Sequence, residues 1–136
     1  MVKINSPNVD VVLAVYNGAN FLEKQIYSIY HQSYKTSRLI IRDDCSSDSS
    51  RDILLKCQKI WPDWIQILSS NNRLGCVGNF STLLEATQSS YIALADQDDL
   101  WDYNKIERCM KECLVQEEIL GNNLPILVHS DFRLID

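Results

Sequence analysis

The sequence lacks the features that mark several common classes of protein. No apolar run in its 136 residues approaches the roughly 18–20 residues that a membrane-spanning helix needs. The N-terminus has no basic region followed by a long apolar stretch, so it does not resemble a secretory signal. The basic residues are scattered and the formal net charge is −5, so the basic stripe of a nucleic-acid-binding protein is missing. We therefore expect a cytoplasmic protein that binds no nucleic acid.

The cysteines and glycines also lack the spacings of well-known sites. The five cysteines are an odd number and include no C-x-x-C pair, which argues against a disulfide framework or a zinc site. Cys109 and Cys113 fall on one predicted helix face with Ile106 and Met110, so we expect them to be core thiols. The phosphate-binding patterns G-x-x-x-x-G-K-[ST] and G-x-G-x-x-G are absent. An acidic protein that binds a phosphorylated ligand must offset the ligand's negative charge in another way, and a divalent cation is the natural candidate.

Short apolar runs alternate with stretches of helical periodicity. The runs occupy residues 9–15, 39–41, 65–68, 91–95 and 126–128, and they resemble strands that are covered on both faces. Four amphipathic stripes lie between them, of which the third carries Val77, Phe80, Leu84 and Thr87. This alternation predicts a Rossmann-like α/β/α sandwich with a mainly parallel central sheet. Because there is no repeat or linker, we expect residues 1–136 to form a single domain.

Polar residues follow four of the predicted strands. They occupy residues 16–18, 43–44, 71–73 and 96–99. Ligands of open parallel sheets bind outside the carboxyl ends of the strands, so these four segments define the expected site.

The densest of these segments contains Asp96, Asp98 and Asp99. Acids also favour the first turn of a helix, but three of them at the exit of one apolar strand need a further reason. Their hard oxygen ligands suit Mg²⁺, Mn²⁺ or Ca²⁺. The spacing alone does not separate a nucleotide-sugar transferase from a phosphatase or a nucleotidyltransferase.

Four motifs in order resemble those of family-two glycosyltransferases, which have the GT-A fold. They are VVLAVYNG at residues 11–18, IRDDCSSD at 41–48, NRLG at 72–75 with Asn79 and Phe80, and ADQDDLW at 95–101. The resemblance extends from Val9 to about Asp131. Cys45 is a departure, because the family most often has Gly or Asn at that position.

The resemblance implies a nucleotide-sugar donor, linked to UDP or dTDP. Asp44 matches the acid that contacts uracil or thymine, and Asp96 matches the acid nearest the ribose. Ala14 and Tyr16 match the loop beside the base, and Arg73 matches a region that can also touch it.

The resemblance also implies a metal site of the DXD type. Asp98 and Asp99 match the acids that hold the diphosphate through Mn²⁺ or Mg²⁺. The metal stabilises the leaving group while an acceptor hydroxyl attacks the anomeric carbon with inversion.

The same resemblance guides what we expect of the whole enzyme. The D-Q-D-D-x-W motif is similar to that of rhamnosyltransferase-like members from bacterial surface polysaccharide synthesis. The acceptor is then a saccharide or a lipid-linked saccharide, and peripheral membrane association of the full-length protein is compatible with this. The attack requires a general base, which we expect to lie beyond Asp136, so this chain is expected to bind the donor without efficient transfer.

Two other classes of protein stay open from the residues alone. A nucleotidyltransferase-like enzyme would also bind nucleotide and metal, but it would carry a Gly-rich basic loop where Tyr16 to Asn20 stand. A non-enzymatic, flavodoxin-like interaction domain also has acids at its strand ends. A response regulator of that type would need a phosphoacceptor Asp near Ser69 and a Lys near Ser130.

Overall fold

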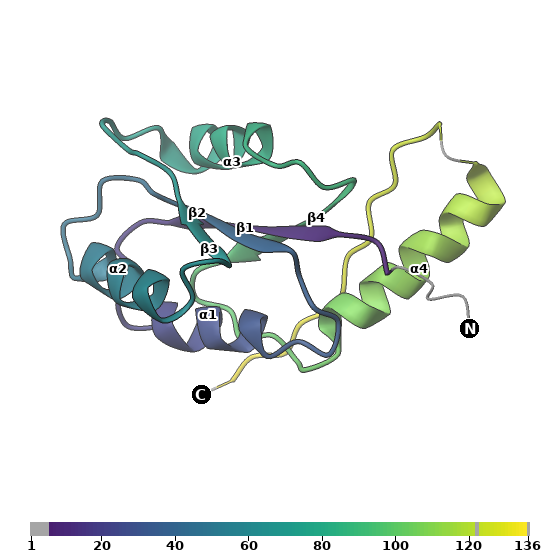
Figure 1. Ribbon diagram of the computed structural model, residues 1–136, viewed down its shortest axis with the longest axis horizontal. Coiled ribbons are helices and arrows are strands. Elements are labelled where there is room, and N and C mark those ends of the chain that lie inside the picture. The colour runs from purple at the N-terminus through teal and green to yellow at the C-terminus, as the bar shows by residue number, and fades with distance from the viewer. Residues whose placement is uncertain (1–5, 122, 136) are drawn as a thin grey trace.

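Four parallel strands form the centre of the molecule in the computed structural model, which describes residues 6–121 and 123–135 (Figure 1). They are β1 (Val9–Val15), β2 (Arg38–Asp43), β3 (Ile65–Ile67) and β4 (Tyr91–Asp96). Their order across the sheet is β3-β2-β1-β4, and every ladder between neighbours is parallel. The prediction of a mainly parallel central sheet is therefore confirmed.

Helices cover both faces of this sheet. Helices α1 (Leu22–Tyr30), α2 (Ser50–Ile60) and α4 (Lys105–Leu120) pack on one face. Helix α3 (Gly75–Glu85) packs on the other face, against β1 and β2, as Figure 1 shows above the sheet. The result is the α/β/α sandwich that the sequence predicts.

The side chains of the central strand β1 alternate between the two layers of helices. Val11 and Leu13 belong to the core shared with α1, α2 and α4, whereas Val12 packs with Ile40 and Leu83 under α3. Burial on both faces explains why β1 reads as a continuous apolar run rather than as an alternating one.

The predicted apolar stripe of α3 is wrong in part: Phe80 packs against the core under this helix, but Leu84 is 41% exposed. Val77 is 85% exposed, and the buried residues of this helix are Asn79 and Leu83. Asn79 turns inward because its amide has partners on Arg42 of strand β2. Helix α4 departs less from the prediction, since Ile106 and Met110 are buried but Cys109 and Cys113 are only half-buried.

The strand predicted at residues 126–128 is also wrong, because the segment has no regular secondary structure. It lies beside α4 instead, where Pro125 to His129 form a shallow cavity with Glu112, Gln116 and Leu120. A strand is stabilised by pairing, and Pro125 has no N–H to donate to a ladder. The three apolar residues that follow it find no strand partner among the described residues.

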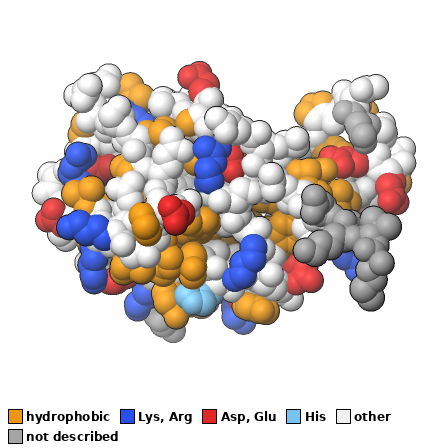
Figure 2. Space-filling view, in the orientation of Figure 1, with side chains coloured by type: hydrophobic (Ala, Val, Ile, Leu, Met, Phe, Trp, Pro, Cys, Tyr) orange, Lys and Arg blue, Asp and Glu red, His pale blue; other side chains and the backbone are white. Residues whose placement is uncertain are grey.

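Exposed apolar side chains gather over helices α1 and α2 (Figure 2). Part of this surface is an aromatic cluster in which Tyr30 lies 4.6 Å from Trp61 and 5.1 Å from Trp64, centroid to centroid. These rings tie the ends of the two helices together at the edge where the strands begin. No helix in the described ranges is both long and apolar enough to cross a bilayer.

Candidate functional site

The carboxyl ends of the four strands meet at one edge of the sheet, and the loops that follow them surround a cavity. Its volume is about 310 Å³. The lining comes from the β1, β2 and β4 ends and from α3 with the loop before it. The lining residues are Ala14, Val15, Tyr16, Asp44, Arg73, Gly75, Cys76, Asn79, Phe80, Asp96, Gln97 and Asp98.

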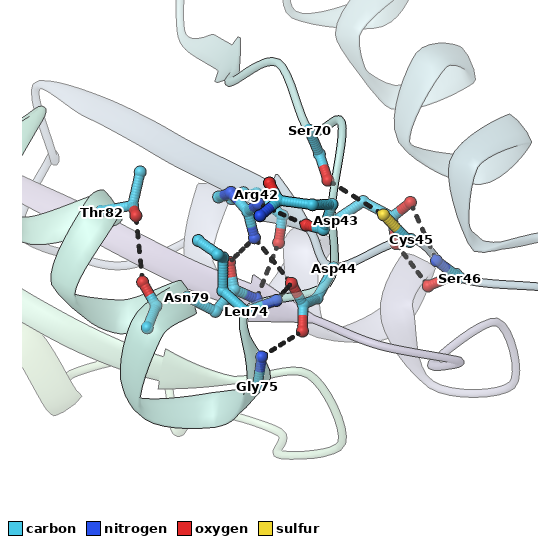
Figure 3. A network of polar contacts seen from close by, with 12 residues as sticks. Arg42, Asp43, Asp44, Cys45, Ser46, Ser70, Leu74, Gly75, Asn79 and Thr82 are labelled. Atoms are coloured by element: carbon cyan, nitrogen blue, oxygen red, sulfur yellow. Dashed lines mark hydrogen bonds and ion pairs between the residues drawn. The ribbon is translucent and has the colours of Figure 1, made fainter.

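Asp44 is the centre of a buried polar network in the wall of this cavity (Figure 3). Its Oδ1 accepts hydrogen bonds from Arg42 Nη1 and from the backbone N–H of Leu74, both at 2.7 Å. Its Oδ2 accepts a hydrogen bond from the backbone N–H of Gly75 at 2.8 Å. The carboxylate therefore joins the end of β2 to the first residues of α3.

Arg42 extends the same network from strand β2. Its Nη1 also donates to Asn79 Oδ1 at 3.0 Å, and its Nη2 donates to the carbonyl oxygen of Asn72 at 2.9 Å. Asn79 returns a hydrogen bond from Nδ2 to the carbonyl oxygen of Arg42 at 3.2 Å. The side chains of Arg42 and Asp44 are each 3% exposed, so the ion pair is removed from water and depends on these partners.

These contacts set the ionisation of Asp44. Burial of the carboxyl raises its pKa, but the hydrogen bonds from Leu74, Arg42 and Gly75 outweigh that effect and hold the pKa below its usual value. Asp44 is therefore an ionised, acceptor-only group at neutral pH. Each carboxylate oxygen has two lone pairs, and Oδ2 uses only one of them within the protein.

We expect the protein to lose stability in acid through Asp44 and Asp10. The buried Asp10 also has a lowered pKa, because hydrogen bonds from Arg38, Gln88 and Ser89 outweigh the effect of burial. Both folded-state pKa values lie below the ordinary 3.8, so their contribution is present above that pH and is lost as the pH falls through the folded values. Urea unfolding at pH 7, 4 and 3 measures this decline, and the Asp10→Asn variant should show a shallower one. A free energy of unfolding that stayed constant down to pH 3 would contradict the assignment.

Arg73 and Tyr16 face each other across the mouth of the cavity. The guanidinium carbon of Arg73 lies 3.9 Å from the centroid of the Tyr16 ring, which is a cation–π contact. Both side chains are exposed, and they come from opposite walls, since Tyr16 follows β1 and Arg73 precedes α3. Together they offer flat surfaces on which a planar ring can stack.

The loop after β1 is bonded to the loop after β2. The backbone N–H groups of Asn17 and Gly18 donate to Ser46 Oγ and Ser50 Oγ, each at 2.9 Å. In return, Asn17 Oδ1 accepts a hydrogen bond from Ser47 N at 2.8 Å. Cys45, the residue that departs from the family pattern, has a φ of 62°, a left-handed conformation that suits Gly or Asn better than Cys.

Polar side chains of helix α1 and of the segment that follows it hold the backbone of the acidic loop after β4, and two of them, Gln25 and Gln32, are buried. Gln25 Nε2 donates to the carbonyl oxygen of Asp96 at 2.9 Å, and Ser28 Oγ accepts from Trp101 N at 3.1 Å. Gln32 Nε2 donates to the carbonyl oxygen of Asp102 at 2.8 Å. These contacts fix the backbone that carries the acids and leave the carboxylates free.

The carboxylates of this loop lie close enough to affect one another. Partial removal of its carboxyl from water raises the pKa of Asp96, the charges of Asp99 and Asp98 raise it further, and Lys105 opposes them. Asp96 and Asp98 line the cavity, whereas Asp99 does not. In the described part of the chain, no three His, Cys, Asp or Glu side chains converge as a metal site by themselves.

This donor set fits a divalent cation that is shared with a ligand. Mg²⁺ is commonly bound by one or two carboxylates together with substrate phosphates and water. Asp98 and its neighbours supply hard oxygen ligands, and Lys105 offsets part of the negative field at Asp96. Mn²⁺ or Mg²⁺ would thus be held jointly by the protein and a phosphorylated molecule.

The structure brings together six of the seven residues that the sequence analysis assigns to the site. Ala14, Tyr16, Asp44, Arg73, Asp96 and Asp98 all line the cavity, and Asp99 lies outside the lining. Two cavity residues, Gln97 and Asn79, are not assigned to the site by the sequence. The Gln97 amide contacts the backbone of Tyr16 in the loop after β1, and the Asn79 amide contacts the backbone of Arg42 in strand β2. The sequence does hint at a role for Gln97, because it is a neutral amide between two acids of the ADQDDLW motif.

The fold and the cavity define an α/β domain of the GT-A type with a polar ligand site at the carboxyl edge of its sheet. The family model for glycosyl transferase family 2 matches residues 10–123, and the chain belongs to that family. Among curated relatives it is 36% identical over 107 residues to the dTDP-rhamnosyl transferase RfbG of Shigella flexneri, covering 76% of this chain and 37% of the relative.

Two further proteins illustrate the range of the similarity. The chain is 30% identical over 123 residues to WfgD of Escherichia coli, a UDP-Glc:alpha-D-GlcNAc-diphosphoundecaprenol beta-1,3-glucosyltransferase, covering 85% of this chain and 47% of the relative. A solved mannosyltransferase, PcManGT of Pyrobaculum calidifontis in complex with GDP-Man and Mn²⁺, aligns with a TM-score of 0.73 at 22% identity. That alignment covers 79% of this chain and 32% of the mannosyltransferase. The chain thus spans less than half the length of each of these proteins.

Proposed function

We propose that residues 1–136 form a nucleotide-sugar-binding domain, and that its donor is linked to UDP or dTDP. Asp44 supports the choice of base, because an ionised carboxylate accepts hydrogen bonds and cannot donate them. Asp44 lines the cavity, and its Oδ2, which accepts one hydrogen bond within the protein, can accept the imide N–H of uracil or thymine. The base would lie beside Ala14, against the stacked pair of Tyr16 and Arg73.

The diphosphate would lie over the acidic loop. Asp96 is suited to contact the ribose, and Asp98, with Asp99 beside it, would hold Mn²⁺ or Mg²⁺ against the diphosphate. The bound metal supplies Lewis-acid stabilisation of the leaving group. The protein's own part is to hold the acids in place through Gln25, Ser28 and Gln32.

We propose that the full reaction is the inverting transfer of a sugar to a saccharide or lipid-linked acceptor in bacterial surface polysaccharide synthesis. The similarity to a rhamnosyl transferase and to a glucosyltransferase acting on a diphosphoundecaprenol acceptor supports this class of reaction. Membership of family 2 favours it over the nucleotidyltransferase and flavodoxin-like alternatives. Among the described residues we assign no general base, so binding, not transfer, is the proper test.

Isothermal calorimetry with UDP, dTDP and GDP, each with Mn²⁺ and with EDTA, tests the proposal. We expect UDP or dTDP to bind, GDP to bind more weakly, and Mn²⁺ to strengthen binding by about tenfold or more. Asp98→Ala should abolish that gain. Asp102→Ala removes an exposed acid of the same loop outside the cavity lining and should retain it.

Each part of the proposal has an outcome that contradicts it. If neither UDP nor dTDP bound, the donor site would be wrong. If GDP bound as tightly as UDP, the role of Asp44 in base selection would be wrong. If EDTA and Asp98→Ala changed nothing, the metal assignment would be wrong.

A further inference from the structure

Gln97, which stands between two acids of the β4 loop, bonds to the backbone of a different loop. Its Oε1 accepts a hydrogen bond from the backbone N–H of Tyr16 at 2.8 Å. Its Nε2 donates to the carbonyl oxygen of the same residue at 2.9 Å. The two contacts engage both backbone groups of Tyr16 with a single side chain that is 81 residues away in the sequence.

These two hydrogen bonds extend the parallel pairing of β1 and β4 by one step through a side chain. Strands β1 and β4 pair up to Ala14 opposite Asp96, and β4 ends at Asp96. Beyond that point the primary amide of Gln97 takes the place of a backbone rung, because it presents one acceptor and one donor, as a peptide unit does. Glutamate has the same length but only acceptors, and would face the carbonyl oxygen of Tyr16 with a second oxygen.

Gly18 provides the space in which the Gln97 amide lies. A Cβ added at Gly18 would meet Gln97 Oε1 and would lie 2.6 Å from its Cδ. Gly18 does not have a positive φ, so the backbone conformation does not explain this glycine. The approach of the amide does explain it.

The two loops that Gln97 joins carry the two halves of the proposed donor site. Tyr16, stacked with Arg73, belongs to the half that receives the base. Asp96 and Asp98, on either side of Gln97, belong to the half that receives the ribose and the metal-bound diphosphate. A nucleoside diphosphate that reaches both halves binds well only if their separation is set in advance.

We propose that Gln97 is a positioning residue that couples the base half of the site to the metal half. Gly18 acts as its socket, which means that the missing side chain of Gly18 leaves the space that the Gln97 amide occupies. The inference rests on the proposed function. When the bridge is broken, the two loops move independently, and a cation bound at one no longer favours a base bound at the other. The quantity that reports this is the gain in nucleotide affinity caused by Mn²⁺.

The test uses the full chain, with UDP and dTDP as probes, at a temperature well below the unfolding midpoint of every variant. For Gln97→Ala and Gln97→Glu we expect the Mn²⁺ gain to shrink by about fivefold or more. Affinity measured in EDTA should change much less. Gln88→Ala, which removes an exposed glutamine at the opposite edge of the sheet, is the matched control and should keep the full gain.

A double-mutant cycle with Gly18→Ala isolates the contact. Alone, Gly18→Ala should displace the Gln97 amide and reproduce the loss seen for Gln97→Ala. In the Gln97→Ala background the same change should have no further effect, because the side chain that the new methyl group would meet is gone. Hydrogen exchange at the amide of Tyr16 should be fast in all three variants and slow in the wild type.

The outcomes separate the inference from the function on which it rests. If the wild type binds neither UDP nor dTDP, the proposed function fails and the positioning role falls with it. If the wild type shows the Mn²⁺ gain and Gln97→Ala keeps it, only the positioning role is wrong. If the two substitutions are additive, Gly18 acts independently of Gln97 and its assignment as the socket is wrong.

Discussion

Replacing Asp44 with alanine is expected to lower the free energy of unfolding by about 3–5 kcal/mol, because it leaves a buried guanidinium without its counter-ion. Arg42 and Asp44 are 2.7 Å apart, and both side chains are 3% exposed. The substitution also removes the acceptor of the backbone N–H groups of Leu74 and Gly75 at the start of α3. The loop that carries Arg73 would keep the hydrogen bond from Arg42 to Asn72 but would lose both backbone hydrogen bonds to Asp44.

Urea unfolding monitored by circular dichroism measures this loss, and Asp63→Ala, which removes an exposed acid outside the described ion pairs, is the control. A domain of this size has only about 5–15 kcal/mol of stability in total, so the variant will be fragile. The double variant Arg42→Ala with Asp44→Ala removes both charges, so it leaves no unpaired buried charge and can be measured even if Asp44→Ala does not fold. It should be more stable than the sum of the two single losses implies.

The nucleotide-binding result separates the two roles of Asp44. The double variant lacks the acceptor for the base, so under the proposed function it should not bind UDP or dTDP even where it is folded. An Asp44→Ala variant with wild-type stability would show that the ion pair contributes nothing to the fold. A folded double variant with unchanged nucleotide affinity would show that Asp44 is purely structural.

The sheet was largely predictable from the sequence because three of its four strands coincide with continuous apolar runs. The apolar runs at residues 9–15, 65–68 and 91–95 match β1, β3 and β4 to within one residue at each end. The exception is β2, which also includes Arg38, Arg42 and Asp43. Arg38 reaches Asp10, and Arg42 reaches Asp44, so each charge has a partner that a pattern of apolar residues does not reveal.

Long-range pairing of polar groups also explains what could not be predicted of the site. The acids and Tyr16 are recognisable because they follow strands and match a family motif. Asn79, Gln97, Gln25 and Gln32 are amides, which ordinarily lie on the surface. Here each contacts a segment distant in the sequence, and only the tertiary structure brings those segments together.

Replacing Gln32 is expected to destabilise the protein strongly, because its buried amide holds the start of helix α4. Its side chain is 1% exposed, and its Oε1 accepts the backbone N–H of Ile106 at 3.0 Å. That N–H lies in the first turn of α4, where no carbonyl of the same helix is in reach. Gln32, from the segment after α1, thus caps a helix that begins more than 70 residues later.

Replacing Gln32 with leucine preserves most of the packing volume and removes the polar contacts. The N–H of Ile106 would be left buried without a partner, and the bond to the carbonyl oxygen of Asp102 would be lost. We expect the free energy of unfolding to fall by about 2–4 kcal/mol. Gln58→Leu is the graded control, since its amide makes one long bond of 3.3 Å to Ile65, and it should cost less than about 1 kcal/mol.

The same substitution should act on the acidic loop, which lies between β4 and the helix that Gln32 caps. Hydrogen exchange across residues 97–106 should quicken in Gln32→Leu while the loop after β1, which Gln97 still holds, keeps its protection. Under the proposed function, Mn²⁺ should then bind less tightly because Asp98 and Asp99 are held less firmly. Unchanged stability together with unchanged exchange would show that another donor and acceptor replace the amide, and that the loop is held by Gln25 and Ser28 alone.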